Sequence, residues 1–224
     1  MPSGFPIRTG APAVSDEWLE RFGDVGSTLV ADGAGGRGVF TRLRAIDPAT
    51  RLIGTALTVH AQPRDNLILY KAAEIARAGD VLVVRTGGGR DCALIGDILA
   101  EVLQRAGFAG LVTDALIRDA DGIQRLGWPV FCAGTHVAGP GKVGGHGIGF
   151  PVVVAGVMVR AGDLIVGDAD GVVAASPGDF EAIWAGVEKK RTSEAASRQA
   201  IAEGLRIPPA NASTLAETPY RHLE

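Results

Sequence analysis

Residues 81–121 have the sequence VLVVRTGGGRDCALIGDILAEVLQRAGFAGLVTDALIRDAD, and this stretch decides the fold. It alternates a short apolar run, a turn-rich segment and a run at helical spacing, then repeats the apolar run. The predicted elements are a strand over 80–85, a glycine-rich loop over 86–90, a helix from Leu94 or Gly96 to Ala106, a strand over 111–116, and a loop that carries Arg118 and Asp119. The order strand, helix, strand indicates a parallel crossover unit.

The crossover places polar residues from both of its loops at one edge of the sheet. The helix begins near Gly96 and Asp97, beside the carboxyl end of the first strand. Arg118 and Asp119 follow the second strand, and parallel strands end at the same edge. We therefore expect two carboxylates and one guanidinium to lie together there.

These residue types favour binding of an anion beside a divalent cation. The free backbone amides of residues 96–99 would attract an anion, and Arg118 would grip a carboxylate through two nitrogens. Asp119 and Asp97 offer the hard oxygen ligands that Mg²⁺ or Mn²⁺ prefers. Such a site suits a 2-oxo acid whose enolate is stabilised by the cation. The alternative is that Asp97 only caps the helix and that Arg118 and Asp119 form an ion pair in a loop.

The rest of the chain predicts one α/β domain over residues 1–224, because no repeat or low-complexity linker divides it. Further expected elements are helices over 15–22, 25–32 and 66–78, strands over 52–59, 129–133, 151–159 and 163–166, a glycine-rich loop over 135–149, and a hairpin through 167–171 to a strand over 172–175. Residues 179–204 predict a long charged helix with Ile183, Trp184 and Val187 as its apolar cluster. We expect this tail, from about residue 179, to pack on a neighbouring subunit.

Composition excludes several classes of protein. The 224 residues carry 22 Lys and Arg against 25 Asp and Glu, with no basic face for nucleic acid. The two cysteines, Cys92 and Cys132, argue against a disulfide scaffold or structural zinc and favour a reducing compartment. The N-terminal residues lack a signal-peptide core, and no apolar run is long enough to span a membrane. These features lead us to expect a soluble, cytoplasmic protein.

Several weaker signals have simpler explanations. The loop 86–90 could cradle a phosphate, but it lacks the Lys-Ser/Thr pair of a P-loop. Residues 168–171 resemble the start of a calcium loop, but the later acidic ligands are missing and a hairpin turn is preferred. No metal-ligand spacing links the scattered histidines His60, His136 and His146. The lysines that a Schiff-base enzyme would need occur in polar contexts: Lys71, Lys142, Lys189 and Lys190.

Asp97, followed after a spacer of 20 residues by Arg118-Asp119, resembles the signature of one family of class II pyruvate aldolases. These are the 4-hydroxy-4-methyl-2-oxoglutarate/4-carboxy-4-hydroxy-2-oxoadipate aldolases of the RraA-like superfamily, named for regulator of ribonuclease E activity A. Motifs along most of the chain extend the resemblance: LIGTA at 52–56, Asp65-Asn66, GDVLV at 79–83, GLVTD at 110–114 and GDLIVGDADGV at 162–172.

The resemblance implies a swivelling β/β/α fold that assembles as a homotrimer or hexamer. Arg118 and the amides of Gly96, Asp97, Ile98 and Leu99 would bind the substrate carboxylate, and Asp119 would ligate Mg²⁺ or Mn²⁺. Asp97 would act on the metal through water, and Glu194 from a neighbouring subunit is a candidate for completing the metal shell.

The resemblance also implies an activity. Family enzymes cleave 4-hydroxy-2-oxo acids to pyruvate and a second oxo acid, and they commonly decarboxylate oxaloacetate through the same enolate. The loop that carries Arg90, Asp91 and Cys92 is expected to face the far end of the substrate. The alternative within the superfamily is a regulator without catalytic activity that binds and inhibits a ribonuclease. The complete set of Asp97, Arg118 and Asp119 favours the enzyme.

Overall fold

A mixed sheet forms the centre of the protein, whose computed structural model describes residues 4–221; the ends of the predicted domain lie outside that range. Eight strands belong to the sheet, in the order β1-β6-β4-β3-β2-β11-β12, with β8 also paired to β2. Their bounds are β1 Arg44–Ala45, β2 Leu52–Ala61, β3 Asp80–Arg85, β4 Gly110–Thr113, β6 Val130–Cys132, β8 His146–Ile148, β11 Leu164–Asp168 and β12 Gly171–Ala175. Two short pairs lie outside it: β5 Leu116–Ile117 with β7 Gly134–Thr135, and β9 Val152–Val154 with β10 Val157–Val159.

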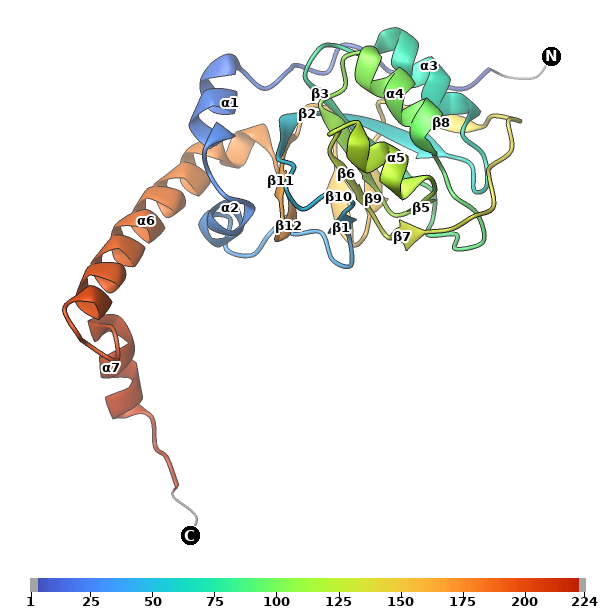
Figure 1. Ribbon diagram of the computed structural model, residues 1–224. Coiled ribbons are helices and arrows are strands. Elements are labelled where there is room, and N and C mark those ends of the chain that lie inside the picture. The colour runs from blue at the N-terminus through green and yellow to red at the C-terminus, as the bar shows by residue number, and fades with distance from the viewer. Residues whose placement is uncertain (1–3, 222–224) are drawn as a thin grey trace.

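Helices cover the sheet in two groups (Figure 1). The first group is α3 Leu67–Ile75, α4 Asp97–Arg105 and α5 Ala120–Arg125. The second lies at the β11–β12 end and consists of α1 Asp16–Gly23, α2 Ser27–Gly33, the 3-10 turn η1 Pro177–Asp179 and α6 Phe180–Ala202, beyond which comes α7 Pro209–Glu217. The predicted α/β class is therefore confirmed, with helices and strands alternating through the first two thirds of the chain.

Strand β3 shows how the sequence divides the core into two layers. Val81 and Val83 pack in one cluster with residues of the β9–β10 hairpin, whereas Leu82 and Val84 pack in another with α3 and α4. All four side chains are fully buried, as expected for a strand covered on both faces. The pleat alternates side chains between faces, so a continuous apolar run fills both layers.

The parallel strands set the position of the loops. β3 pairs in parallel with β2 and β4, and β4 pairs in parallel with β6. The segments that follow β3, β4 and β6 therefore leave the sheet at one edge, as the crossover predicts.

Some predicted elements are shorter than expected. The strand predicted over 111–116 breaks after Thr113, whose hydroxyl accepts a hydrogen bond from the amide of Ala115 at 3.1 Å. The helix predicted over 66–78 ends at Ile75, because Ala76 has an extended backbone. Part of the predicted loop 135–149 is strand β8, which pairs with β2.

The predicted hairpin through 167–171 is confirmed, with Asp168 opposite Gly171. Asp168 accepts hydrogen bonds from Ser27 N at 2.7 Å, Ser27 Oγ at 2.6 Å and Asp170 N at 3.1 Å. Burial alone would raise the pKa of Asp168, but these hydrogen bonds outweigh it and lower the pKa. Its carboxylate thus fixes helix α2 to the hairpin, which is a structural role.

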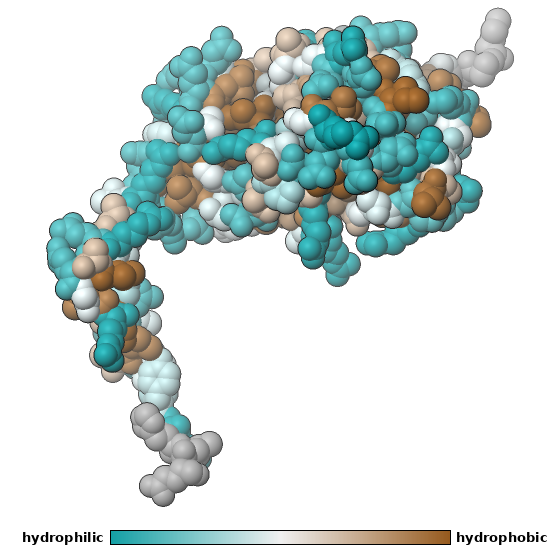
Figure 2. Space-filling view, in the orientation of Figure 1, coloured by the Kyte–Doolittle hydropathy of each residue, from teal (hydrophilic) through white to brown (hydrophobic). Residues whose placement is uncertain are grey.

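The long tail helix α6 packs on its own chain over its first half. Phe180, Ile183 and Val187 are buried in a cluster with α1, α2 and β12. Gly186 permits close contact with α2, since a Cβ there would lie 2.7 Å from Gly33 Cα. The second half of α6 extends away from the body together with α7 (Figure 1), and brown apolar patches lie along it in Figure 2. The predicted packing on a neighbouring subunit stays a prediction for this half.

Within residues 4–221, no helix combines the length and apolar character needed to cross a membrane. Both cysteines are free thiols and are buried.

Candidate active site

Two loops of the crossover unit build the site, and backbone hydrogen bonds join them. The amide of Arg118 donates to the carbonyl of Ile95 at 2.9 Å, so the loop after β5 lies against the start of α4. Asp119 follows with a left-handed backbone (φ 55°) and serves as the N-cap residue of α5. A left-handed non-glycine residue is strained, and such strain is often found where a side chain must point at a ligand.

Three glycines allow the charged side chains to approach this junction. A Cβ on Gly96 would overlap the Asp119 carboxylate and lie 3.2 Å from Arg118 Nε. A Cβ on Gly139 would lie 2.6 Å from Arg118 Nη1, and one on Gly122 would lie 2.7 Å from Asp97 Oδ2. The structure therefore brings Asp97, Arg118 and Asp119 together around backbone that has no room for a side chain.

These residues line a pocket of about 360 Å³, called here the Arg118 pocket. Its lining consists of Asn66, Tyr70, Gly96, Asp97, Ile98, Leu99, Arg118, Asp119, Gly139, Pro140 and Lys142. Every residue predicted for substrate binding is among them. On the other side of Arg118 and Asp119 a second hollow is lined by Thr135, His136 and Val137, so the pair stands between two openings.

A second cation, Lys142, also lines the Arg118 pocket, although the sequence indicated only a polar context for it. Lys142 Nζ donates to Asn66 Oδ1 at 3.1 Å and to Tyr70 Oη at 3.2 Å, and it lies 4.5 Å from the centre of the Tyr70 ring. Asn66 Nδ2 in turn donates to the carbonyl of Leu94 at 2.9 Å. The Asp65-Asn66 motif is the sequence feature that could have indicated the position of Lys142. Buried Asp65 accepts amide hydrogen bonds from Leu67 and from the loop that follows Lys142.

The two carboxylates of the pocket suit a magnesium-type ion. Asp97 Oδ1 accepts the amide hydrogen of Ile98 at 2.8 Å, which leaves Oδ2 for another partner. Asp119 Oδ2 lies 3.4 Å from Arg118 Nε, and its side chain is 46 % exposed. Among the described residues no group of three or more His, Cys, Asp or Glu could hold a metal. Mg²⁺ accepts such a sparse set, because it keeps several waters and takes one or two carboxylates.

Two further segments that the sequence indicated for the active site do not line the Arg118 pocket. Glu194 is on the second half of α6, where it pairs with Arg198 at 2.9 Å, and it does not line the Arg118 pocket of its own chain. The loop over 90–92 contributes no residue to the Arg118 pocket of its own chain, so the expectation that it faces the far end of the substrate stays a prediction. Asp91 pairs with Arg64 at 2.7 Å, and both residues line a separate small hollow together with Cys92.

Two histidines that are remote in sequence prove to be neighbours. His60 and His146 stack with ring centres 4.2 Å apart, because β2 pairs with β8. His60 Nε2 also lies 2.6 Å from Arg85 Nη1. Burial, and then the charges of His146 and Arg85, lower the pKa of His60. His136 lies apart from them, beside Arg118 and Asp119.

The sequence of the chain matches a known protein family and one of its relatives. A family model described as RraA-like, Aldolase/RraA, matches residues 12–174. A protein of Halalkalibacterium halodurans, provisionally named 4-hydroxy-4-methyl-2-oxoglutarate aldolase, is 33% identical over 84% of this chain and 90% of its own length.

Solved structures agree on the fold. RraAS2 of Streptomyces coelicolor, described as an unusual member of the RNase ES inhibitor RraA family, superimposes with a TM-score of 0.74 at 28% identity, covering 84% of this chain and 98% of its own. The RNA-processing inhibitor RraA of Thermus thermophilis gives a TM-score of 0.61 at 24% identity, covering 68% and 93%.

Proposed function

Since this chain belongs to the Aldolase/RraA family, we propose that it is a divalent-metal-dependent aldolase, a carbon–carbon lyase. Its substrate would be a 4-hydroxy-2-oxo acid such as 4-hydroxy-4-methyl-2-oxoglutarate or 4-carboxy-4-hydroxy-2-oxoadipate, cleaved to pyruvate and a second oxo acid. Oxaloacetate decarboxylation would be a side activity. One observation carries the proposal: Arg118, Asp119, Asp97 and the first amides of α4 line one pocket.

Each residue has a role that its contacts support. Arg118 presents its guanidinium fork to the substrate carboxylate, and the start of α4 adds backbone donors and the positive end of a helix dipole. Asp119 would hold Mg²⁺ or Mn²⁺ directly, with Asp97 acting through water. The bound cation would supply Lewis-acid stabilisation of the charge that develops on the 2-oxo group.

The remaining lining residues position these groups. Asp97 Oδ2, the oxygen not bonded to Ile98, is our candidate acceptor for the water that takes the proton of the C4 hydroxyl. Lys142, fixed by Asn66 and Tyr70, supplies a second positive charge to the lining of the pocket. A homotrimer or hexamer in the cytoplasm completes the proposal, with Glu194 of a neighbouring subunit as a further metal ligand.

The test measures pyruvate release from 4-hydroxy-4-methyl-2-oxoglutarate and from oxaloacetate with Mg²⁺ or Mn²⁺, then with EDTA. Metal-dependent release that EDTA stops and fresh metal restores is the expected result. Release that EDTA leaves unchanged would contradict the metal proposal. Absence of release from both substrates would favour the second candidate, a regulator of a ribonuclease, which the likeness to RraAS2 keeps open. That candidate is tested by adding the protein to a ribonuclease assay.

A further inference from the structure

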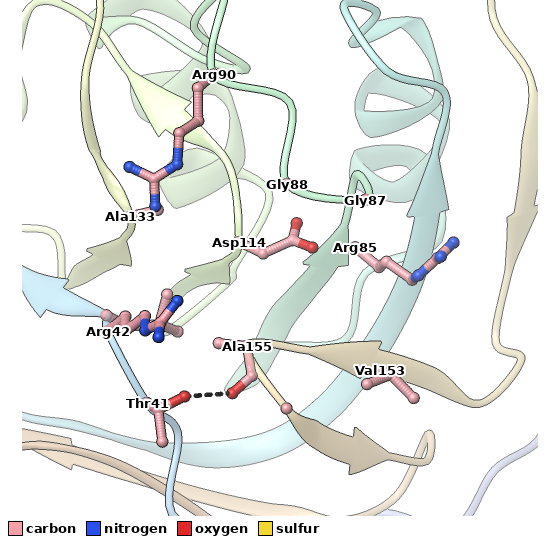
Figure 3. A pocket seen from close by; sticks show the side chains of 12 residues that line it. Thr41, Arg42, Arg85, Gly87, Gly88, Arg90, Asp114, Ala133, Val153 and Ala155 are labelled. Atoms are coloured by element: carbon pink, nitrogen blue, oxygen red, sulfur yellow. Dashed lines mark hydrogen bonds between the residues drawn. The ribbon is translucent and has the colours of Figure 1, made fainter.

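A second cavity of about 570 Å³ lies at the same edge of the sheet and shares no lining residue with the Arg118 pocket. It is called here the triple-arginine cavity (Figure 3). Its walls are Thr41, Arg42, Leu43, Arg85, Gly87, Gly88, Arg90, Asp114, Ala133, Val153, Ala155 and Gly156. These residues come from the ends of β3, β4 and β6, from the loop before β1 and from the β9–β10 hairpin.

The charges of this cavity favour an anion. The lining includes three arginines, Arg42, Arg85 and Arg90, but one acidic residue, Asp114. Figure 3 shows Arg42 and Arg90 approaching the space beside Ala133 from opposite directions, with Asp114 between them and Arg85. Cavities lined by one sign of charge concentrate ions of the opposite sign.

Two of the three arginines are available to a ligand. Among residues 4–221, Arg42 and Arg90 have no hydrogen-bond or ion-pair acceptor, whereas Arg85 lies 2.6 Å from His60 Nε2. Asp114 uses one of its two carboxylate oxygens in hydrogen bonds within the protein. Its Oδ1 accepts hydrogen bonds from Thr86 N at 2.7 Å and Thr86 Oγ1 at 3.0 Å, so Oδ2 remains for a donor.

The backbone at Arg42 is strained. Arg42 has a left-handed backbone with φ 63°, and its neighbour Thr41 hydrogen-bonds through Oγ1 to the carbonyl of Ala155 at 3.0 Å (Figure 3). Ala155 is left-handed as well, with φ 45°. Arg42 and Ala155 are thus two left-handed non-glycine residues linked through Thr41, and backbone strain of this kind clusters at functional sites.

We propose that the triple-arginine cavity binds a small phosphate monoester that carries a free hydroxyl group. A phosphate monoester has a charge of about −1.5 to −2 at pH 7, which matches the excess of arginine. Its tetrahedral oxygens can accept from Arg42 and Arg90 at once, whereas a planar carboxylate matches one fork. Asp114 Oδ2 accepts the hydroxyl and repels further carboxylates. Leu43, Ala133 and Val153 provide apolar wall for the carbon chain.

The test titrates the protein with glycerol 3-phosphate, with propyl phosphate, which lacks the hydroxyls, and with citrate, followed by calorimetry. Glycerol 3-phosphate should bind more tightly than the other two. Arg42→Gln and Arg90→Gln should each weaken its binding by about tenfold or more, because each removes a charge-assisted contact. Asp114→Asn keeps an acceptor for Thr86 and should reduce the preference for glycerol 3-phosphate over propyl phosphate.

Two controls locate the binding. Arg37→Gln removes an exposed arginine that lines neither pocket and should leave the affinity unchanged. Arg118→Gln should also leave it unchanged; if that variant abolished binding, the ligand would occupy the Arg118 pocket and the proposal would be overturned. Tighter binding of citrate than of glycerol 3-phosphate by the Arg118→Gln variant, or no binding of any probe, would overturn it too. Because no turnover is measured, the outcome is independent of the aldolase assay.

Discussion

The Arg118 pocket and the triple-arginine cavity lie at the same edge of one sheet, but they are assembled in different ways. The first takes most of its charged residues from one crossover unit, whose two loops are joined by the hydrogen bond from Arg118 N to Ile95. The second collects residues from segments between Thr41 and Gly156. The comparison teaches that a site built within one supersecondary unit leaves a pattern in the sequence, whereas a site shared among distant loops does not.

The largest expected effect concerns the Arg118 pocket. Asp119→Asn should lower metal-dependent pyruvate release by about 10²–10³-fold, since an amide replaces the charge that would hold the cation. The matched control is Asp121→Asn, which changes an exposed carboxylate two residues further along α5 that does not line the pocket. Thermal unfolding should be similar for both variants. Equal activity of the two would refute the role assigned to Asp119.

A backbone change should disturb the same pocket almost as strongly. Gly96→Ala would place a Cβ against the Asp119 carboxylate and 3.2 Å from Arg118 Nε, forcing both away from the helix start. A displacement of that kind can cost about 10²-fold in turnover. Gly23→Ala is the control, because its Cβ would meet nothing within 4 Å. The measurement is kcat for oxaloacetate decarboxylation. Unchanged turnover in Gly96→Ala would show that the close approach of Arg118 and Asp119 to the Gly96 backbone is unimportant.

The sequence predicted the first pocket well for a physical reason. The alternation of β3, α4 and β4 is local, and chain direction alone fixes where Asp97 and Arg118 meet. The sequence did not predict that Lys142 lines the same pocket, because the loop over 135–149 has no periodicity and is held by side-chain contacts to Asp65 and Asn66. The strand break after Thr113 has no signal in the sequence pattern for a similar reason, because it coincides with one local side-chain hydrogen bond, from Ala115 N to the Thr113 hydroxyl.

The triple-arginine cavity depends on pairings that no local pattern contains. The loop over 86–90 by itself lacks the Lys-Ser/Thr pair of a P-loop, so its sequence does not predict a phosphate site. The loop before β1 adds Arg42 to the cavity, and the segment after β4 adds Asp114. The contact of His60 with His146 has the same origin, because the pairing of β2 with β8 is set by long-range packing.

A smaller effect would sharpen the comparison by testing how firmly the second cavity is held. Thr86→Val removes the hydroxyl that donates to Asp114 Oδ1 at 3.0 Å and keeps the volume of a buried side chain. The free energy of unfolding should fall by about 1 kcal/mol, since the amide of Thr86 still donates to the same oxygen. Denaturant titration measures it, with Thr9→Val, at an exposed position, as the control. No loss of stability would mean that the hydroxyl does not fix Asp114.

The smallest expected effect is the contribution of His60 to the pH dependence of folding stability. Its pKa in the folded protein is lowered from 6.5, first by burial and then by the charges of His146 and Arg85, against an opposing effect of Asp114. The unfolded chain therefore takes up the proton first, and stability falls as the pH drops below about 6.5 toward the lowered value. His60→Asn should flatten this part of the curve of urea midpoint against pH, whereas His136→Asn, outside the stack, should retain it. If His60→Asn kept the full slope below neutral pH, His60 would have no part in the pH dependence of stability.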